Sequence, residues 1–239
     1  MDAVWAVVVA GGSGSRFGGA KQYETIDGRA VIEWSLTAAA DACDGVVAVV
    51  PPRDVGHRPL MMSRPPDVVV GGGRTRSASV RNGLAAVPDD ASIVVVHDAA
   101  RPLAAAPLWA ASIDAVRCGA DAALCAVPLT DTVKRVSEVA PSRCAGPLEP
   151  GGVRSEGPLG PWVVETIDRS ALVAVQTPQA FRAAVLRAAH LGGPEATDDG
   201  ALVEALGGRV VVVPGSPVNI KITHPHDLVL AAALAGLAR

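Results

Sequence analysis

Short apolar runs of strand length recur along this chain and alternate with segments of helical spacing. The runs are rich in β-branched residues and carry no polar alternation, which is typical of strands covered on both faces. Strands are predicted at Val4–Val9, Val46–Val50, Val68–Val70, Ile93–Val96, Ala122–Val127 and Val210–Val213. Helices are predicted at Val31–Ala42, Ser77–Ala86, Leu108–Cys118, Ala183–His190, Asp199–Leu206 and Pro225–Leu237, the last with Thr223 as its N-cap.

The alternation of strands and helices predicts an α/β fold. We expect a Rossmann-like, doubly wound and mainly parallel sheet with helices on both faces. In such sheets, ligands bind beyond the carboxyl ends of the strands. The glycine-rich segment VVVAGGSGSRFGGAKQY, Val7–Tyr23, follows the first predicted strand at that edge.

One segment interrupts the alternation. Pro141–Pro161 contains five prolines and five glycines, a composition that excludes a helix or a central strand. It lies between two strand-like pieces, Thr132–Val136 and Trp162–Ile167, which predicts a protruding β-arm over residues 132–168. Two interpretations stay open: a disordered surface insertion, or an arm that reaches a second subunit in a homodimer.

Composition narrows the class of protein. A chain of 239 residues predicts one domain carrying the arm as an insertion, without a fused second enzyme. The net charge of −3 and the lack of a basic run give no reason to expect nucleic-acid binding. The N-terminus has no features of a signal peptide or membrane span, and the four cysteines have no metal-site spacing. We therefore expect reduced thiols in a cytoplasmic protein that does not contact membranes.

The glycine-rich loop fits neither common phosphate motif. A GxGxxG fingerprint fails because Phe17 stands where its third glycine belongs, and no acidic residue ends the second strand. A P-loop fails because Ala20 precedes Lys21, and Gln22 replaces the hydroxyl that binds Mg²⁺. Glycines nevertheless let backbone N–H groups converge on an anion, and Arg16 and Lys21 add positive charge. These features predict a site for the triphosphate of a nucleotide.

Seven motifs follow one another along the chain: AGGSGSRFGGAKQY, GGGRTRSASVRNGL, HDAARP, PLTDTVKRV, TIDRSALVAVQTPQAF, TDDGALVEALG and NIKIT. Together and in this order they resemble the motifs of one family, the 2-C-methyl-D-erythritol 4-phosphate cytidylyltransferases of the non-mevalonate isoprenoid pathway. Ala20 stands where the family usually has proline, and the Pro/Gly-rich segment is longer than expected of the family.

The resemblance implies that a phosphate oxygen of the sugar-alcohol phosphate attacks the α-phosphorus of CTP and releases pyrophosphate. Such a nucleophile is already ionised near neutral pH, so alignment and positive charge are required rather than a general base. The implied catalytic residues are Arg16, Lys21 and Lys221. Mg²⁺ is the implied cofactor, with Asp98 as a ligand of its shell or a contact of the ribose.

Four residues within these motifs are expected to have structural roles: His97 in packing or hydrogen bonding, Asp198 and Asp199 in capping a helix, and Lys134 as an exposed strand residue.

The resemblance also implies two sets of binding residues. The expected nucleotide contacts are Ala10, Gly11, Gly12, Gly14, Gly72, Gly73, Arg76, Ser79 and Asp98. The expected substrate contacts are Arg101, Thr177 and Thr197, with Thr132 and Arg169 reaching the substrate from the arm of a partner subunit.

Two other functions stay open. A cytidylyltransferase acting on ribitol 5-phosphate would use the same CTP machinery, and only the polyol pocket would differ. A regulatory module that binds CTP without turnover is a candidate from a different class. It would need no acceptor site, which disfavours it because Thr132 and Arg169 accompany the nucleotide residues.

Overall fold

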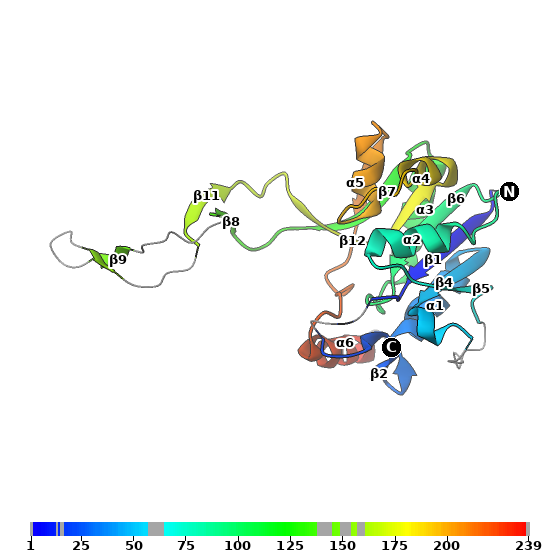
Figure 1. The fold of residues 1–239 in the computed structure, drawn as a ribbon, viewed down its shortest axis with the longest axis horizontal. Coiled ribbons are helices and arrows are strands. Elements are labelled where there is room, and N and C mark those ends of the chain that lie inside the picture. Colours follow the sequence, from blue (N-terminus) through cyan, green and yellow to red (C-terminus); the bar gives the residue numbers. More distant parts are fainter. Residues whose placement is uncertain are drawn as a thin grey trace. The chain divides into compact units, whose positions relative to one another are not determined.

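The computed structural model describes residues 2–12, 14, 17–56, 65–137, 145–148, 154–156 and 161–237. The chain divides into two compact units: residues 1–127 with 175–239, and residues 128–174. Figure 1 traces the strands and helices of the first unit along the chain, from blue through green to red.

The first unit is built on a seven-stranded sheet. Its strands are β1 (Val4–Val9), β4 (Gly45–Val50), β5 (Val68–Gly71), β6 (Ile93–Asp98), β7 (Ala122–Pro128), β12 (Val173–Arg182) and β13 (Val210–Pro214). Their spatial order is β13-β7-β12-β6-β1-β4-β5. β1 pairs in parallel with β4 and β6, β4 with β5, and β7 with β13, so the mainly parallel sheet is confirmed.

The helices of this unit are α1 (Val31–Ala42), α2 (Arg76–Leu84), α3 (Ala106–Arg117), α4 (Ala183–Ala189), α5 (Asp199–Ala205) and α6 (Pro225–Leu237). On one face of the sheet, Leu36 of α1 and Trp109 of α3 pack against Val8 of β1. On the opposite face, Val80 of α2, Leu186 of α4 and further residues of α5 form a second core. Helices therefore cover both faces of the sheet, and the doubly wound prediction is confirmed.

Strand β12 was absent from the sequence-based expectations. It lies between β7 and β6 in the sheet and pairs antiparallel with β6. Its sequence, VAVQTPQAFR, carries three polar residues and a proline in the middle, which hides the apolar pattern of a buried strand. Gln176, Thr177 and Gln179 are nonetheless buried. The strand thus brings polar side chains into the sheet next to Asp98, at the end of β6.

The second unit consists of short antiparallel pairs. β8 (Val133–Val136) pairs with β11 (Val163–Ile167), as the two flanking strand-like pieces predicted. Within the Pro/Gly-rich segment, β9 (Ala145–Leu148) pairs with β10 (Arg154–Glu156). Trp162, Val163 and Val164 are more than half exposed in this unit. Such a run of exposed apolar side chains is typical of a protein–protein contact surface.

Helix α6 closes the first unit against a small hairpin of β2 (Thr25–Ile26) and β3 (Arg29–Ala30). The prediction that Thr223 caps this helix is wrong. The helix begins at Pro225, and Asp227 of its first turn reaches back instead, where one carboxylate oxygen accepts from the backbone N–H groups of Thr223 and His224, both at 2.7 Å. The Thr223 hydroxyl donates to the carbonyl of Lys221 at 3.2 Å. Two 3-10 helices complete the fold, η1 (Lys21–Tyr23) and η2 (Pro52–Asp54).

Candidate functional site

The loop after β1 has a turn that only glycine permits. Gly14 has φ +67°, and a Cβ at this position would lie 1.8 Å from the carbonyl oxygen of Gly19. The N–H groups of Phe17 and Gly18 donate to the Gly14 carbonyl, both at 2.9 Å, and close the loop on itself. Arg16, the predicted partner of Lys21, lies outside the described residues.

Two glycine loops pack against each other at the edge of the sheet. A Cβ on Gly11 would lie 3.1 Å from the Cα of Gly72, and a Cβ on Gly72 would lie 3.1 Å from the Cα of Gly11. Gly11 lines the adjoining cavity, whereas Gly72 is not among the residues around it. Gly72 therefore has a packing role here, which brings the loop after β5 against the loop after β1, and its nucleotide contact stays a prediction.

A cavity of about 490 Å³ opens between these loops. Thr75 caps α2 at its mouth by accepting from the N–H of Ala78 at 3.0 Å. The Ser79 hydroxyl accepts from the N–H of Gly73 at 3.1 Å and donates to the Thr75 carbonyl at 2.9 Å, which fixes the loop before α2. The predicted residues that line this cavity are Ala10, Gly11, Gly12, Gly14, Lys21, Gly73, Arg76, Ser79, Asp98 and Lys221.

A second cavity of about 310 Å³ lies next to the first. Three of the predicted substrate residues line it: Arg101, Thr177 and Thr197. Arg76, Asp98 and Lys221 line both cavities. The two cavities therefore meet at these three charged side chains, where two bound molecules would be closest to each other.

The charges at this junction are paired. Asp98, whose side chain is only 12% exposed, accepts from Arg76 at 3.2 Å and from Lys221 at 2.5 Å through different carboxylate oxygens. Burial by itself would raise the pKa of Asp98, but the guanidinium of Arg76 and the ammonium of Lys221 outweigh it. The pKa of Asp98 therefore lies well below its ordinary value, and the carboxylate stays ionised.

The guanidinium of Arg76 also binds Asp199, which is fully buried, at 2.7 Å. Asp199 receives a second contact from Nε2 of His190 at 3.0 Å. The expectation that Asp198 and Asp199 both cap a helix is thus half wrong. Asp198 is the N-cap of α5 and accepts from the N–H of Ala201, whereas Asp199 links that helix to Arg76. Sequence reasoning missed this role because nothing local distinguishes the two carboxylates.

Lys21 and Lys221 reach the first cavity from opposite ends of the chain. The Lys21 ammonium donates to the carbonyl of Ile222 at 2.5 Å, directly beside Lys221. The segment that carries Lys221 is anchored by Asn219, whose side chain donates to Gln176 at 3.1 Å and to the Thr177 carbonyl at 2.9 Å. Gln176 and Asn219 are supporting residues that sequence analysis did not single out.

Arg101 supports the same segment from the other side. Its guanidinium donates to the carbonyl of Asn219 at 2.7 Å. The prediction that Arg101 contacts substrate is compatible with its position in the second cavity, and the contact itself stays a prediction.

His97 is fully buried and contacts Trp109, as expected for a packing and hydrogen-bonding residue. Thr177 accepts from the N–H of Asp98 at 3.0 Å. Because the carbonyl that faces Nε2 can only accept, the neutral His97 ring carries its proton on Nε2, and Nδ1 accepts from the Thr177 hydroxyl at 3.1 Å. Nε2 of His97 then donates to the carbonyl of Arg101 at 3.2 Å. This chain of hydrogen bonds holds the turn that carries Asp98 and Arg101.

The remaining two predicted substrate residues, Thr132 and Arg169, belong to the second unit. Both are exposed there, and the Arg169 guanidinium donates to the carbonyl of Thr130. Lys134 is exposed in β8, as expected, and donates to the Thr166 hydroxyl at 2.5 Å.

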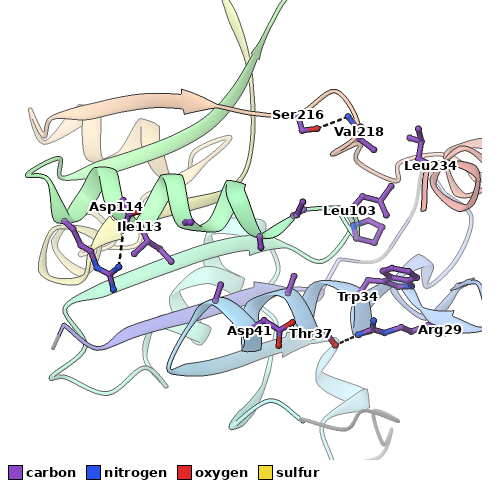
Figure 2. Close-up of a pocket in the computed structure, with 18 residues that line it drawn as sticks. Arg29, Trp34, Thr37, Asp41, Leu103, Ile113, Asp114, Ser216, Val218 and Leu234 are labelled. Atoms are coloured by element: carbon purple, nitrogen blue, oxygen red, sulfur yellow. Dashed lines mark hydrogen bonds and ion pairs between the residues drawn. The ribbon is translucent and has the colours of Figure 1, made fainter. Parts of the chain in front are cut away.

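A larger cavity of about 740 Å³ is lined by a different set of residues. Figure 2 shows Trp34 of α1, Ile113 of α3, Leu234 of α6 and Leu103 around it. None of the candidate site residues lines it. The size of a cavity therefore does not identify the reacting site in this chain, whereas the convergence of charged groups does.

A doubly wound sheet with a glycine-rich loop after β1, and cations gathered at that edge, is typical of nucleotide-binding enzymes. The model of the 2-C-methyl-D-erythritol 4-phosphate cytidylyltransferase family matches residues 4–143 and 153–236. The chain belongs to this family.

Named relatives agree with this membership. The chain is 43% identical to the 2-C-methyl-D-erythritol 4-phosphate cytidylyltransferase of Streptomyces coelicolor, over 98% of this chain and 85% of the relative. It is 44% identical to the bifunctional enzyme IspD/IspF of Anaeromyxobacter dehalogenans, over 98% of this chain but only 57% of that relative's length.

Solved structures show the same fold. The crystal structure of the 2-C-methyl-D-erythritol 4-phosphate cytidylyltransferase from Thermus thermophilus superposes with a TM-score of 0.73 at 35% identity, over 99% of this chain and all of that one. None of the helices that the structure describes has the length and apolar character that a membrane crossing requires.

The buried histidine predicts a pH dependence of stability. Burial lowers the pKa of His97 from 6.5 to about 4, so the folded chain keeps this imidazole neutral where the unfolded chain protonates it. The free energy of unfolding should therefore fall by about 2 kcal/mol between pH 7 and pH 5 through this residue. The contribution of Asp98 is lost only below about pH 4, outside this window.

The measurement is urea unfolding at both pH values. His97→Gln keeps a donor for the Arg101 carbonyl and is expected to be less stable at pH 7, yet to lose about 2 kcal/mol less than the wild type on acidification. Val229→Ala, at an exposed position without a titratable group, should keep the wild-type slope. An unchanged slope in His97→Gln would contradict the assignment.

Proposed function

We propose that this chain transfers the cytidylyl group of CTP to 2-C-methyl-D-erythritol 4-phosphate, forming 4-diphosphocytidyl-2-C-methyl-D-erythritol and pyrophosphate. One observation carries the proposal: Arg76, Asp98 and Lys221 line two adjoining cavities, one with the glycine loops and Lys21, the other with Arg101, Thr177 and Thr197. An enzyme that joins a nucleotide to a second phosphorylated substrate requires two such compartments. Membership of the family supports the same reaction.

In this reaction a phosphate oxygen of the sugar-alcohol phosphate forms a bond to the α-phosphorus of CTP. The bond from that phosphorus to the bridging oxygen breaks, and its electron pair leaves on pyrophosphate. Negative charge grows on the equatorial oxygens, so cations at this point lower the barrier. Lys21, Lys221 and Arg16 are the proposed catalytic residues, and the glycine N–H groups of the first loop hold the triphosphate.

Asp98 has a positioning role in this scheme. Its ion pairs hold Arg76 and Lys221 at the junction of the cavities before substrates bind. When the α-phosphate enters, Lys221 can exchange one oxygen anion for another over a short distance. Because the cations are held in place beforehand, little reorganisation is needed in the transition state.

A divalent cation, Mg²⁺, is the proposed cofactor. Asp98 is the only carboxylate among the described residues that line the first cavity. Mg²⁺ is commonly bound by one or two carboxylates together with substrate phosphates and retained waters, so this donor set fits. Both oxygens of Asp98 already accept from cations, which favours contact through the water shell of the metal. When bound, Mg²⁺ would neutralise charge on the triphosphate.

We further propose that the chain works as a homodimer in the cytoplasm, without nucleic-acid or membrane partners. The exposed apolar run Trp162–Val164 supports the dimer, because it would be covered by a second subunit. Thr132 and Arg169 of one arm are proposed to contact the sugar-alcohol phosphate in the site of the partner. A guanidinium suits a phosphate monoester because it binds two oxygens at once.

A pyrophosphate-release assay tests the function and separates it from the alternatives. With CTP and Mg²⁺, the chain is expected to turn over methylerythritol 4-phosphate and to leave ribitol 5-phosphate unreacted. Turnover of ribitol 5-phosphate alone would assign the chain to the other cytidylyltransferase. Binding of CTP without turnover of either acceptor would identify a CTP-binding module.

The variant Lys21→Ala tests the leading catalytic cation. Removing a charge that acts in the transition state should lower kcat roughly 100- to 1,000-fold. Arg117→Ala removes an exposed cation of α3, paired with Asp114 at 3.2 Å, and should leave kcat unchanged. A kcat of Lys21→Ala within a few fold of the wild type would remove this residue from the mechanism.

Mixing inactive variants tests the shared site. If Arg169 completes the site of the partner, a mixture of Lys21→Ala and Arg169→Ala chains contains heterodimers with one intact site. Random exchange should then restore about a quarter of wild-type activity. Lys21→Ala mixed with Lys221→Ala is the matched control, because both residues act in the same chain and no site is restored. Activity of the first mixture equal to that of the separate variants would refute the partner arm.

A further inference from the structure

Three side chains with metal-ligating atoms converge at the start of α6. His224, His226 and Asp227 each offer one such atom, and these atoms lie within 4.8 Å of one another. In the part of the chain that the structure describes, no other histidine, cysteine or carboxylate residues form a group of three at this spacing. The three residues are not among the proposed substrate contacts.

The separations between these atoms approach those of a metal site. Nε2 of His226 lies 3.4 Å from one oxygen of Asp227, and Nδ1 of His224 lies 3.8 Å from the other. The two imidazole rings are parallel, with an interplanar angle of 3° and 5.4 Å between centroids. Tetrahedral Zn²⁺ with bonds of about 2.1 Å keeps its ligand atoms about 3.4 Å apart. Small side-chain rotations would therefore bring all three onto one ion.

The backbone holds this group in place. Pro225 fixes φ between the two histidines, which limits the motion of the chain there. One oxygen of Asp227 accepts from the N–H groups of Thr223 and His224, so the orientation of the carboxylate is set by the helix cap. The other oxygen faces His226. The imidazoles are 52% and 79% exposed, which leaves room for water or a further ligand on the metal.

We propose that His224, His226 and Asp227 form a binding site for a divalent transition metal, with Zn²⁺ as the best match. Two imidazole nitrogens and one carboxylate are ligands that such ions prefer, whereas Mg²⁺ prefers oxygen ligands alone. This site would therefore bind a different ion from the Mg²⁺ proposed at Asp98.

The position of this site gives it a structural consequence. Thr223, which donates its N–H to Asp227, lines the first cavity, and Lys221 lies two residues before it. A metal on Asp227 and both histidines would fasten the start of α6 to the end of the segment that carries Lys221. The bound ion acts as a clip that stabilises this segment, independently of the reaction proposed for the chain.

Calorimetric titration of Zn²⁺ into the metal-free full chain, without nucleotide, tests the site. One equivalent is expected to bind to the wild type, and the affinity of His224→Ala, His226→Ala and the double variant should fall at least tenfold. Val229→Ala, at an exposed position of the same helix, should bind as the wild type does. A large excess of Mg²⁺ should not displace the ion.

Among the cysteines that the structure describes, Cys118 alone has an exposed thiol that would compete for the ion, and Cys118→Ser serves as the second control. Retained affinity in the double histidine variant, or loss in Cys118→Ser, would overturn the proposal. Absorption of the wild type with bound Co²⁺ provides a check that needs no substitution at the site. Ligand-field bands without an intense thiolate charge-transfer band are expected, and the appearance of that band would also overturn it.

Discussion

The placement of the Asp98 carboxylate is the constraint on which the rest of the site depends. An ionised carboxylate with so little access to water needs cationic partners, and the chain provides them from two distant segments, α2 and the stretch before α6. Arg76 in turn needs a second anion, which is Asp199 at the start of α5. Four elements that share no local sequence are thus held together because no member of the cluster can be left unpaired at low cost.

Close backbone packing complements these charges. The loops after β1 and β5 approach each other closely at Gly11 and Gly72, where a Cβ on either residue would lie 3.1 Å from the Cα of the other. This approach brings the start of α2, and with it Arg76, towards the loop that carries Lys21. Lys21 itself is held against the carbonyl of Ile222, so both ends of the chain meet in one cavity. The hydrogen bonds of His97 and Thr177 then fix the turn between Asp98 and Arg101.

Much of the fold could be read from local patterns. The bounds of β1, α1 and α6 follow from apolar periodicity, and the glycine loops and Lys221 follow from motifs that resemble one family. Strand β12 was not predicted because Gln176, Thr177 and Gln179 look like surface residues until their partners are known. The supporting roles of Asn219 and Asp199 were not predicted for the same reason. A buried polar side chain is recognised by what it bonds to, and its partner lies more than forty positions away in both cases.

The sequence by itself determined the α/β class, the edge of the sheet that carries the glycine loop and the kinds of charge present there, because period, glycine content and motif order are local properties. Only the tertiary structure decided which charges meet. It separated the neighbours Asp198 and Asp199 into a helix cap and a buried ion pair, and it made Thr223 a donor to Asp227 where a capping hydroxyl had been expected. These outcomes depend on distances between segments far apart in the chain, and hydrogen bonds and ion pairs act only over a few ångströms.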